Sequence, residues 1–390
     1  MSNPLVQKSP AGAKTPGQNQ LKGRDIAIDY LRSFVIVLVV FHHAALAYTS
    51  FSTFNETRYV DSTAPVIDAS RWSFLDPFVT FNDTFFMALL FFVSGLFTVA
   101  SLERKGSGGF FMARLQRLGI PFAVASLSII PLAYWPSRLL AVSEPQTPYW
   151  ITFFTSDGWP SGPLWFLWVL LAFSSLVALA NRIAPTMLAK LRRQPTGLVI
   201  FLVTIVSYLP LSLLVSRYSW TSLGGPFDVQ TSRIALYFAY FLLGTALGPS
   251  QQWRRIGWPK HWGAWFIVGV LSFFVYVWLL VNDAIPLPTL VSEAMLSVTF
   301  AASCAGTSLG FLGVFRRLAC RHHAIFDSLS ANAYGIYIIH YVFIIWIQFA
   351  LLSASWPAWI KFSVTFVGGF ALSWGASQVV RQIPAVRRVL

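Results

Sequence analysis

Ten stretches of about 20 mostly apolar residues recur along the 390-residue chain, and they constrain its fold more than any other feature. A segment of this length crosses the hydrocarbon core of a bilayer as an α-helix, because a helix satisfies its backbone polar groups internally. The sequence therefore predicts an all-α, polytopic membrane bundle of about ten transmembrane helices. We place the spans near residues 28–49, 78–100, 118–136, 163–184, 197–216, 230–249, 262–281, 291–314, 330–352 and 357–380.

Composition agrees with a chain made mostly of membrane spans. Hydrophobic residues make up 56% of the chain and charged residues only 11%, whereas soluble proteins carry about 25% charged residues. Residues 1–24 are rich in Pro, Gly, Gln, Ser and Lys and have almost no large apolar side chains. We therefore expect a disordered cytoplasmic tail over 1–24, followed by one transmembrane domain over 25–390.

The distribution of basic residues predicts the orientation. With these spans, 21 Lys and Arg residues fall on the side of the N-terminal tail and five on the other side. Cytoplasmic loops carry such an excess, so both termini are expected in the cytoplasm and the net charge of +14 needs no nucleic-acid partner. The prediction is a multi-pass protein of the inner or plasma membrane.

The first span carries ionisable residues that an ordinary apolar helix lacks. Asp29 and Arg32 lie at its beginning, and His42 and His43 lie deep inside it. Arg32 and His43 are eleven residues apart, which places them on one helix face about 16 Å apart along the axis, whereas His42 points some 100° away. Ionisable groups at membrane depth are expensive, so His43 is a candidate general base. The alternative is a histidine that only bonds a neighbouring helix.

Two further groups of polar residues could carry chemistry or serve the fold. Arg114 and Arg117 share a helix face at the cytoplasmic end of the third span, where guanidinium groups can bind phosphates or only lipid head groups. His340, in the ninth span, is favoured as a structural residue.

Carboxylates lie near the external ends of two other spans. Asp83 and Glu293 could hydrogen-bond an acceptor hydroxyl or pair with Arg233 or Lys361. Lys361 itself is expected to extend towards the membrane surface.

Taken together, these motifs resemble the membrane-bound acyltransferase family 3. The resemblance covers residues 25–380, and the motif order is closest to glucan biosynthesis protein C-like members. It rests on Arg32-x10-His43 within IDYLRSFVIVLVVFHH, FFVSGLF at 91–97, Arg114-x2-Arg117 before GIP, LWFL in the fourth span, and the late IYIIH.

The resemblance implies an O-acyltransferase that moves an acetyl or succinyl group from cytoplasmic acyl-CoA to a hydroxyl of an extracytoplasmic or membrane-associated glycan. His43 is then the catalytic histidine, Arg32 its basic partner, and Arg114 and Arg117 the residues that bind the acyl-CoA. We place the possible acceptor-site or supporting residues at Asp29, His340, Glu293 and Asp83. No tightly bound cofactor and no metal are expected, since acyl-CoA is a substrate.

A rival interpretation is a transporter or proton-coupled channel. In that case the Asp29, Arg32 and His43 stripe would act as a proton relay. A third is a sensory or structural membrane protein whose polar residues only hold helices together.

Overall fold

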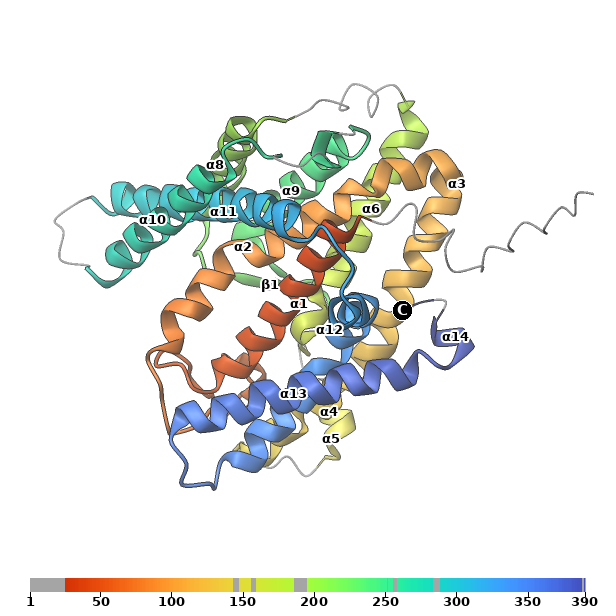
Figure 1. Ribbon diagram of the computed structural model, residues 1–390. Coiled ribbons are helices and arrows are strands. Elements are labelled where there is room, and N and C mark those ends of the chain that lie inside the picture. Colours follow the sequence, from red (N-terminus) through yellow and green to blue (C-terminus); the bar gives the residue numbers. More distant parts are fainter. Residues whose placement is uncertain are drawn as a thin grey trace, which may run out of the picture.

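The protein is described by a computed structural model over residues 25–142, 147–155, 159–185, 195–250, 252–254, 258–282, 288–387 and 389. It is a helical bundle with one short β-hairpin (Figure 1). The main helices are α1 (Ile26–Leu46), α2 (Leu75–Leu96), α3 (Thr98–Arg114), α4 (Ile120–Leu140), α6 (Trp165–Ile183), α8 (Gly197–Leu214), α9 (Ile234–Leu247), α10 (Trp262–Val281), α11 (Thr289–Leu318), α12 (Ala324–Leu351) and α13 (Ala358–Val380).

Shorter elements join these helices. They are η2 (Tyr59–Asp61), the π-helical η3 (Leu115–Gly119), α5 (Tyr149–Thr155), η4 (Gly162–Leu164), β1 (Trp220–Ser222), β2 (Asp228–Gln230), η5 (Thr231–Arg233), η6 (Gln252–Arg254) and α14 (Pro384–Arg387). β1 and β2 pair antiparallel, with Trp220 opposite Gln230, and lead from α8 into α9.

Each of the ten spans predicted from the sequence corresponds to a helix. Within the described ranges, eight helical segments are long and apolar enough to cross a membrane, and α3, η3 and α4 count as one of them. The other two predicted spans are α9, whose apolar segment with η5 has only 17 residues, and α13, which has 23 residues and contains Lys361. The all-α, multi-pass architecture is confirmed.

Helix α1 lies inside the bundle, where it contacts α2, α11, α12 and α13. It begins at a true cap, because the Asp25 side chain accepts the Ile28 backbone N–H at 3.2 Å. Both Asp25 oxygens also accept from Arg316 Nη1, at 2.6 and 2.7 Å, so the start of α1 is tied to the end of α11. Packing and this ion pair together fix the position of the helix that carries the histidines.

Glycines let α2 and α9 approach closely. A Cβ atom on Gly95 would lie 2.2 Å from the Phe241 carbonyl oxygen, and one on Gly244 would lie 2.0 Å from that of Phe92. The glycine of FFVSGLF thus permits close contact between the two helices.

The third predicted span is irregular at its beginning. The backbone turns at Gly106, where φ is +69°, and then passes through the π-helical turn η3, which contains Arg117. Helix α4 continues through Pro131 and Pro136 to Leu140. Helix α4 is thus continuous through both prolines, and the distortion lies beside the arginines.

The expectation that Lys361 extends towards the membrane surface is wrong. The Lys361 ammonium donates to Asp68 Oδ2 at 2.7 Å, and both side chains are only 3% exposed. The backbone N–H of Asp68 donates to the Ala47 carbonyl. A buried charge needs a partner, so this pair fastens the segment between α1 and α2 to α13.

Candidate active site

Two histidines from distant parts of the chain meet where α1 contacts α12. His43 lies in the last turn of α1, and its Nδ1 is 3.3 Å from Nε2 of His340 in α12. The His43 ring also contacts Tyr341 edge to face, with centroids 5.2 Å apart. His340 is fully buried, whereas His43 is half-buried. Sequence spacing indicated His43, and the tertiary structure pairs it with His340.

The surrounding carbonyls decide which ring nitrogens carry protons. His340 Nδ1 lies 2.7 Å from the Tyr337 carbonyl oxygen, and His43 Nδ1 lies 2.8 Å from that of Val39. A carbonyl only accepts, so we assign a proton to Nδ1 of both rings. Neutral His340 then offers its Nε2 lone pair to the His43 Nδ1–H, and neutral His43 keeps its own lone pair on Nε2. This nitrogen is the basic atom of the site.

This arrangement supports proton uptake at His43. A proton added to Nε2 makes an imidazolium whose Nδ1–H already faces two acceptors, Val39 O and His340 Nε2. Hydrogen bonds to charged groups contribute about 1.5–3 kcal/mol, more than neutral ones. His340 therefore orients His43 and stabilises its charged form.

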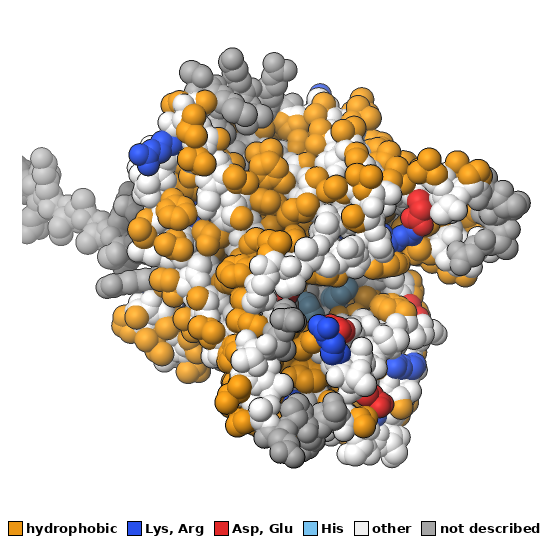
Figure 2. All heavy atoms as spheres, turned by 180° about the vertical axis from the view of Figure 1, so that it is seen from behind, with side chains coloured by type: hydrophobic (Ala, Val, Ile, Leu, Met, Phe, Trp, Pro, Cys, Tyr) orange, Lys and Arg blue, Asp and Glu red, His pale blue; other side chains and the backbone are white. Residues whose placement is uncertain are grey.

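The histidines can be reached from one face of the molecule. Figure 2 shows histidine side chains at the floor of a hollow, next to charged side chains. Among the described histidines, His42 and His43 are half-buried, and their ring centroids are 5.5 Å apart. The partial exposure of His42 and His43 gives a reactant access to the end of α1.

The predicted basic residues lie at the other end of α1 and around the first turns of α12. Arg32 Nη2 is 3.3 Å from Asp29 Oδ1, and Arg32 remains 41% exposed. On α12, Ser330 Oγ is 3.5 Å from the Asp29 carbonyl oxygen, and one turn later the Tyr334 hydroxyl donates to the Arg117 carbonyl. Ser330 and Tyr334 are four residues apart, so the Asp29 and Arg117 backbones contact the same face of α12.

Asp29 therefore supports Arg32 and lies far from His43. The two are 14 residues apart on α1, about 21 Å along its axis. Arg114 lies one turn before Arg117. Its guanidinium packs over the Phe110 ring at 5.1 Å.

Tyrosines of α12 connect the arginines to the histidines. Tyr334 contacts Arg117, the Tyr337 hydroxyl donates to the Pro163 carbonyl, and Tyr341 contacts His43. The spacing of three and four residues places all three on one face of α12. We did not single out these tyrosines from the sequence, although their helical spacing beside IYIIH was a signal for them.

The predicted carboxylates form ion pairs in two different places. Asp83 Oδ2 accepts from Arg233 Nη2 at 2.6 Å, and Glu293 pairs with Arg217. Thr84, next to Asp83, lies 3.3 Å from Ser303 on α11, whereas Glu293 is ten residues, or about 15 Å, from Ser303 along that helix. Asp83 and Glu293 therefore belong to two separate ion pairs.

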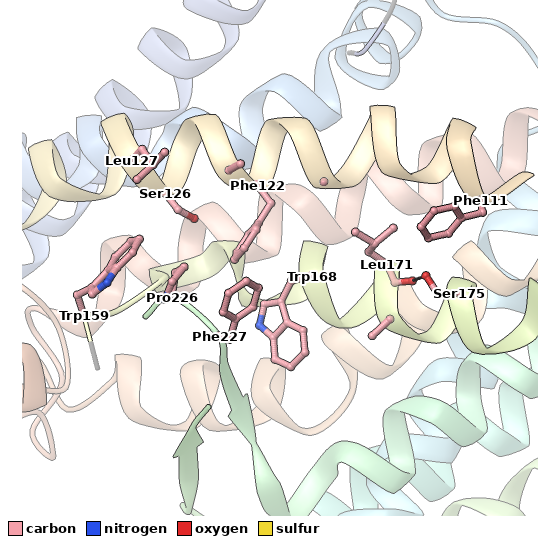
Figure 3. A pocket seen from close by; sticks show the side chains of 13 residues that line it. Phe111, Phe122, Ser126, Leu127, Trp159, Trp168, Leu171, Ser175, Pro226 and Phe227 are labelled. Carbon is pink, nitrogen blue, oxygen red and sulfur yellow. Dashed lines mark hydrogen bonds between the residues drawn. The ribbon is translucent and has the colours of Figure 1, made fainter. Parts of the chain in front are cut away.

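A separate cavity of about 540 Å³ lies between the α3–α4 segment and α6 (Figure 3). Phe227 at the hairpin tip packs against Phe122 and Trp168, with centroids 5.5 and 5.7 Å away. Phe111 and Leu127 are exposed, so this groove is open at the molecular surface, and neither histidine of the pair lines it. Its lining is Phe111, Gly119, Phe122, Ala123, Ser126, Leu127, Trp159, Trp168, Leu171, Ala172, Ser175, Pro226 and Phe227.

Comparison with known proteins bears directly on the chemistry. A family model described as an acyltransferase domain, Acyl_transf_3, matches residues 25–378, from the cap of α1 to the end of α13. The chain belongs to acyltransferase family 3. No curated protein and no solved structure gives a match. This multi-pass membrane protein is thus an acyltransferase, and the histidine pair with the arginines around α12 is its candidate active site.

Proposed function

We propose that this acyltransferase moves an acyl group, acetyl or succinyl, from cytoplasmic acyl-CoA to a hydroxyl of an extracytoplasmic or membrane-associated glycan. The observation that carries the proposal is the pair of contacts at His43 Nδ1, with Val39 O and His340 Nε2, which leaves Nε2 as the basic atom under our tautomer assignment. A proton-relay channel would need no acyl donor, and membership in an acyltransferase family favours the enzyme.

His43 acts as the general base in the proposed reaction. Nε2 takes the proton of the acceptor hydroxyl while the hydroxyl oxygen attacks the thioester carbonyl. The new C–O bond forms, the C–S bond breaks, and the imidazolium returns the proton to the CoA thiolate. A covalent acyl-histidine is the main variant, in which Nε2 attacks the carbonyl first. His340 has the same orienting role in both.

Arg114 and Arg117, with Arg32, hold the CoA phosphates in this proposal. Guanidinium groups match phosphate oxygens in geometry and charge. Tyr334 supports the site because its hydroxyl bonds the Arg117 backbone. Arg32 and His43 are about 16 Å apart along α1, a span comparable to an extended pantetheine arm, so the phosphates could stay at the arginines while the thioester reaches His43.

The proposal requires both termini on the cytoplasmic side. Arg32, Arg114 and Arg117 then face the cytoplasm, and His43 lies towards the external face. Reporter fusions after Leu390 test this orientation: activity of a cytoplasmic reporter is expected, and an external signal would overturn the topology.

Activity of the purified protein is the direct test of function. We expect release of CoA from acetyl-CoA or succinyl-CoA that depends on His43, and transfer of the label to a hydroxyl acceptor. A protein that binds no acyl-CoA and releases no CoA would contradict the proposal. Mass spectrometry of envelope glycans from a deletion strain would then identify the acceptor. The glucan biosynthesis protein C-like motif order favours a glucan.

A further inference from the structure

Asp83 belongs to an ion pair whose two partners differ in exposure. Arg233 Nη2 donates to Asp83 Oδ2 at 2.6 Å, and Nη1 donates to the Asp83 backbone carbonyl at 2.9 Å. The Arg233 side chain is 2% exposed and stacks over Phe300 at 4.7 Å, whereas Asp83 is 38% exposed. Arg233 is therefore fixed in the protein, and it presents a carboxylate to an open space.

The Asp68–Lys361 pair differs from the Asp83–Arg233 pair in exposure. Both of its partners are almost completely buried, as expected for a pair that only fastens segments together. A carboxylate has about four acceptor positions. In the described part of the chain, the hydrogen bonds to the Asp83 side chain engage Oδ2 and leave Oδ1 available.

His42 lies beside the same space. Its ring packs on Phe86, one turn after Asp83, with centroids 5.2 Å apart, and on His43 at 5.5 Å. Asp83 and Arg233 are the charged groups that act on it electrostatically. Its Nδ1 is enclosed and has no partner among the described residues. A buried N–H without an acceptor is rarer than a buried lone pair, so we assign the ring proton to Nε2.

We propose that His42 and Asp83 form the subsite that holds a polyhydroxyl acceptor, a carbohydrate, beside His43. Hydroxyl groups fit this pair because the His42 N–H can donate a hydrogen bond to their oxygen, while Asp83 Oδ1 accepts a hydrogen bond from their O–H. Arg233 neutralises the carboxylate, which favours a neutral ligand over a cation, and the carboxylate itself disfavours an anion. Arg233 is thus a positioning residue.

The subsite rests on the proposed function and refines it. It assigns the two adjacent histidines of α1 different roles: His43 removes the proton, and His42 helps to hold the acceptor. The ring contact between them lets one hydroxyl of a polyol sit on His42 while another is presented to His43.

Acceptor kinetics with the full-length protein in detergent test the subsite. The donor is labelled acetyl-CoA, and the acceptor probes are cellotriose, a neutral polyol, and ethanol, which has a single hydroxyl. Loss of one hydrogen bond to a charged or polar group should raise the KM for cellotriose roughly 10-fold or more in His42→Phe and Asp83→Asn proteins. The KM values for ethanol and acetyl-CoA should stay within about twofold of wild type, since neither engages the subsite.

Two variants control for folding and charge. Asp61→Asn removes another half-exposed carboxylate, 49% exposed, that also pairs with an arginine, and it should leave the cellotriose KM unchanged. If Asp83→Asn fails to fold because it leaves Arg233 unpaired, the double variant Asp83→Asn with Arg233→Met removes both charges. His42→Phe changes no charge pair and keeps the packing on Phe86.

The outcomes separate the two proposals. A wild-type protein that transfers acetyl to ethanol but prefers cellotriose, with the preference lost in both variants, supports the subsite. Unchanged cellotriose KM in both variants, equal losses with both probes, or no wild-type preference for cellotriose would overturn it while leaving acyl transfer intact. A wild-type protein that releases no CoA at all would instead contradict the proposed function.

Discussion

His340 Nε2 lies 3.3 Å from His43 Nδ1, across 297 residues of sequence. Because the His340 Nδ1–H is committed to carbonyls of its own helix, its Nε2 can only accept, and it fixes the His43 ring with the basic nitrogen directed away from α12. In a Ser-His-Asp triad a carboxylate orients the histidine that acts as the base; here the neutral imidazole of His340 has that orienting role towards His43.

His43→Ala should abolish measurable acyl transfer while leaving insertion and CoA binding intact. Removal of a general base typically costs about 10² to 10⁴ in rate. His42→Ala should retain substantial turnover at saturating acceptor, because its ring does not take the proton. Label transfer with acetyl-CoA measures both. An active His43→Ala protein beside an inactive His42→Ala protein would reverse the assignment.

His340→Phe should lower kcat by about 10- to 100-fold, because it removes the acceptor for the His43 N–H, a hydrogen bond of about 1.5–3 kcal/mol once His43 is charged. The KM for acyl-CoA should not change. His340→Gln, whose amide oxygen can accept the same N–H, should recover part of the loss. A rate loss of equal size in both variants would indicate a packing role only.

Arg114→Ala and Arg117→Ala should each weaken CoA binding roughly 10- to 150-fold, the equivalent of one charge-assisted hydrogen bond. Arg104→Ala is the matched control, since Arg104 is an exposed residue of the same α3 segment. Isothermal titration with CoA measures the affinities. If all three variants bind CoA like the wild type, the arginines serve topology alone.

Lys361→Met should destabilise the protein by about 3–5 kcal/mol, because it leaves the Asp68 carboxylate buried without its counter-charge. Thermal unfolding in detergent should show a clear drop in Tm. The double variant Lys361→Met with Asp68→Leu removes both charges and should recover most of the loss. If the single and double variants melt together, the pair does not fasten the segment between α1 and α2.

Asp228, at the beginning of β2 outside the spans, predicts a pH effect on stability. Burial raises the pKa of its carboxyl above the usual value, although the Ser161 N–H donates to it at 3.2 Å. A raised pKa means that folding favours the protonated form, so this stabilisation is present below about pH 4, the unfolded pKa, and is lost as the pH rises through the folded pKa.

Asp228→Asn should therefore raise Tm at pH 7 and have a smaller effect at pH 4, where more of the wild-type carboxyl is protonated. The amide oxygen can still accept the Ser161 N–H. Thermal unfolding of both proteins at the two pH values measures the difference. A Tm gain that is the same at both would show that Asp228 does not titrate in this range.

Local sequence patterns were sufficient to predict the helices and part of the candidate active site. Apolar length predicted each span, because a bilayer requires continuous hydrophobic segments with internally satisfied backbones. The eleven-residue spacing from Arg32 predicted the placement of His43, since both lie on one regular helix. At Gly95 the absence of a side chain leaves room for the α9 backbone, a local effect of residue type.

The partners of the polar residues were decided by the tertiary structure alone. Asp83 could pair with Arg233 or Lys361 on sequence grounds; it pairs with Arg233, 150 residues away, while Lys361 reaches Asp68, 293 residues away. Helical periodicity specifies which face a side chain occupies, but it carries no information about which helix will cover that face. His340 becomes the partner of His43 only because α12 packs against α1, and that contact depends on the packing of the whole bundle.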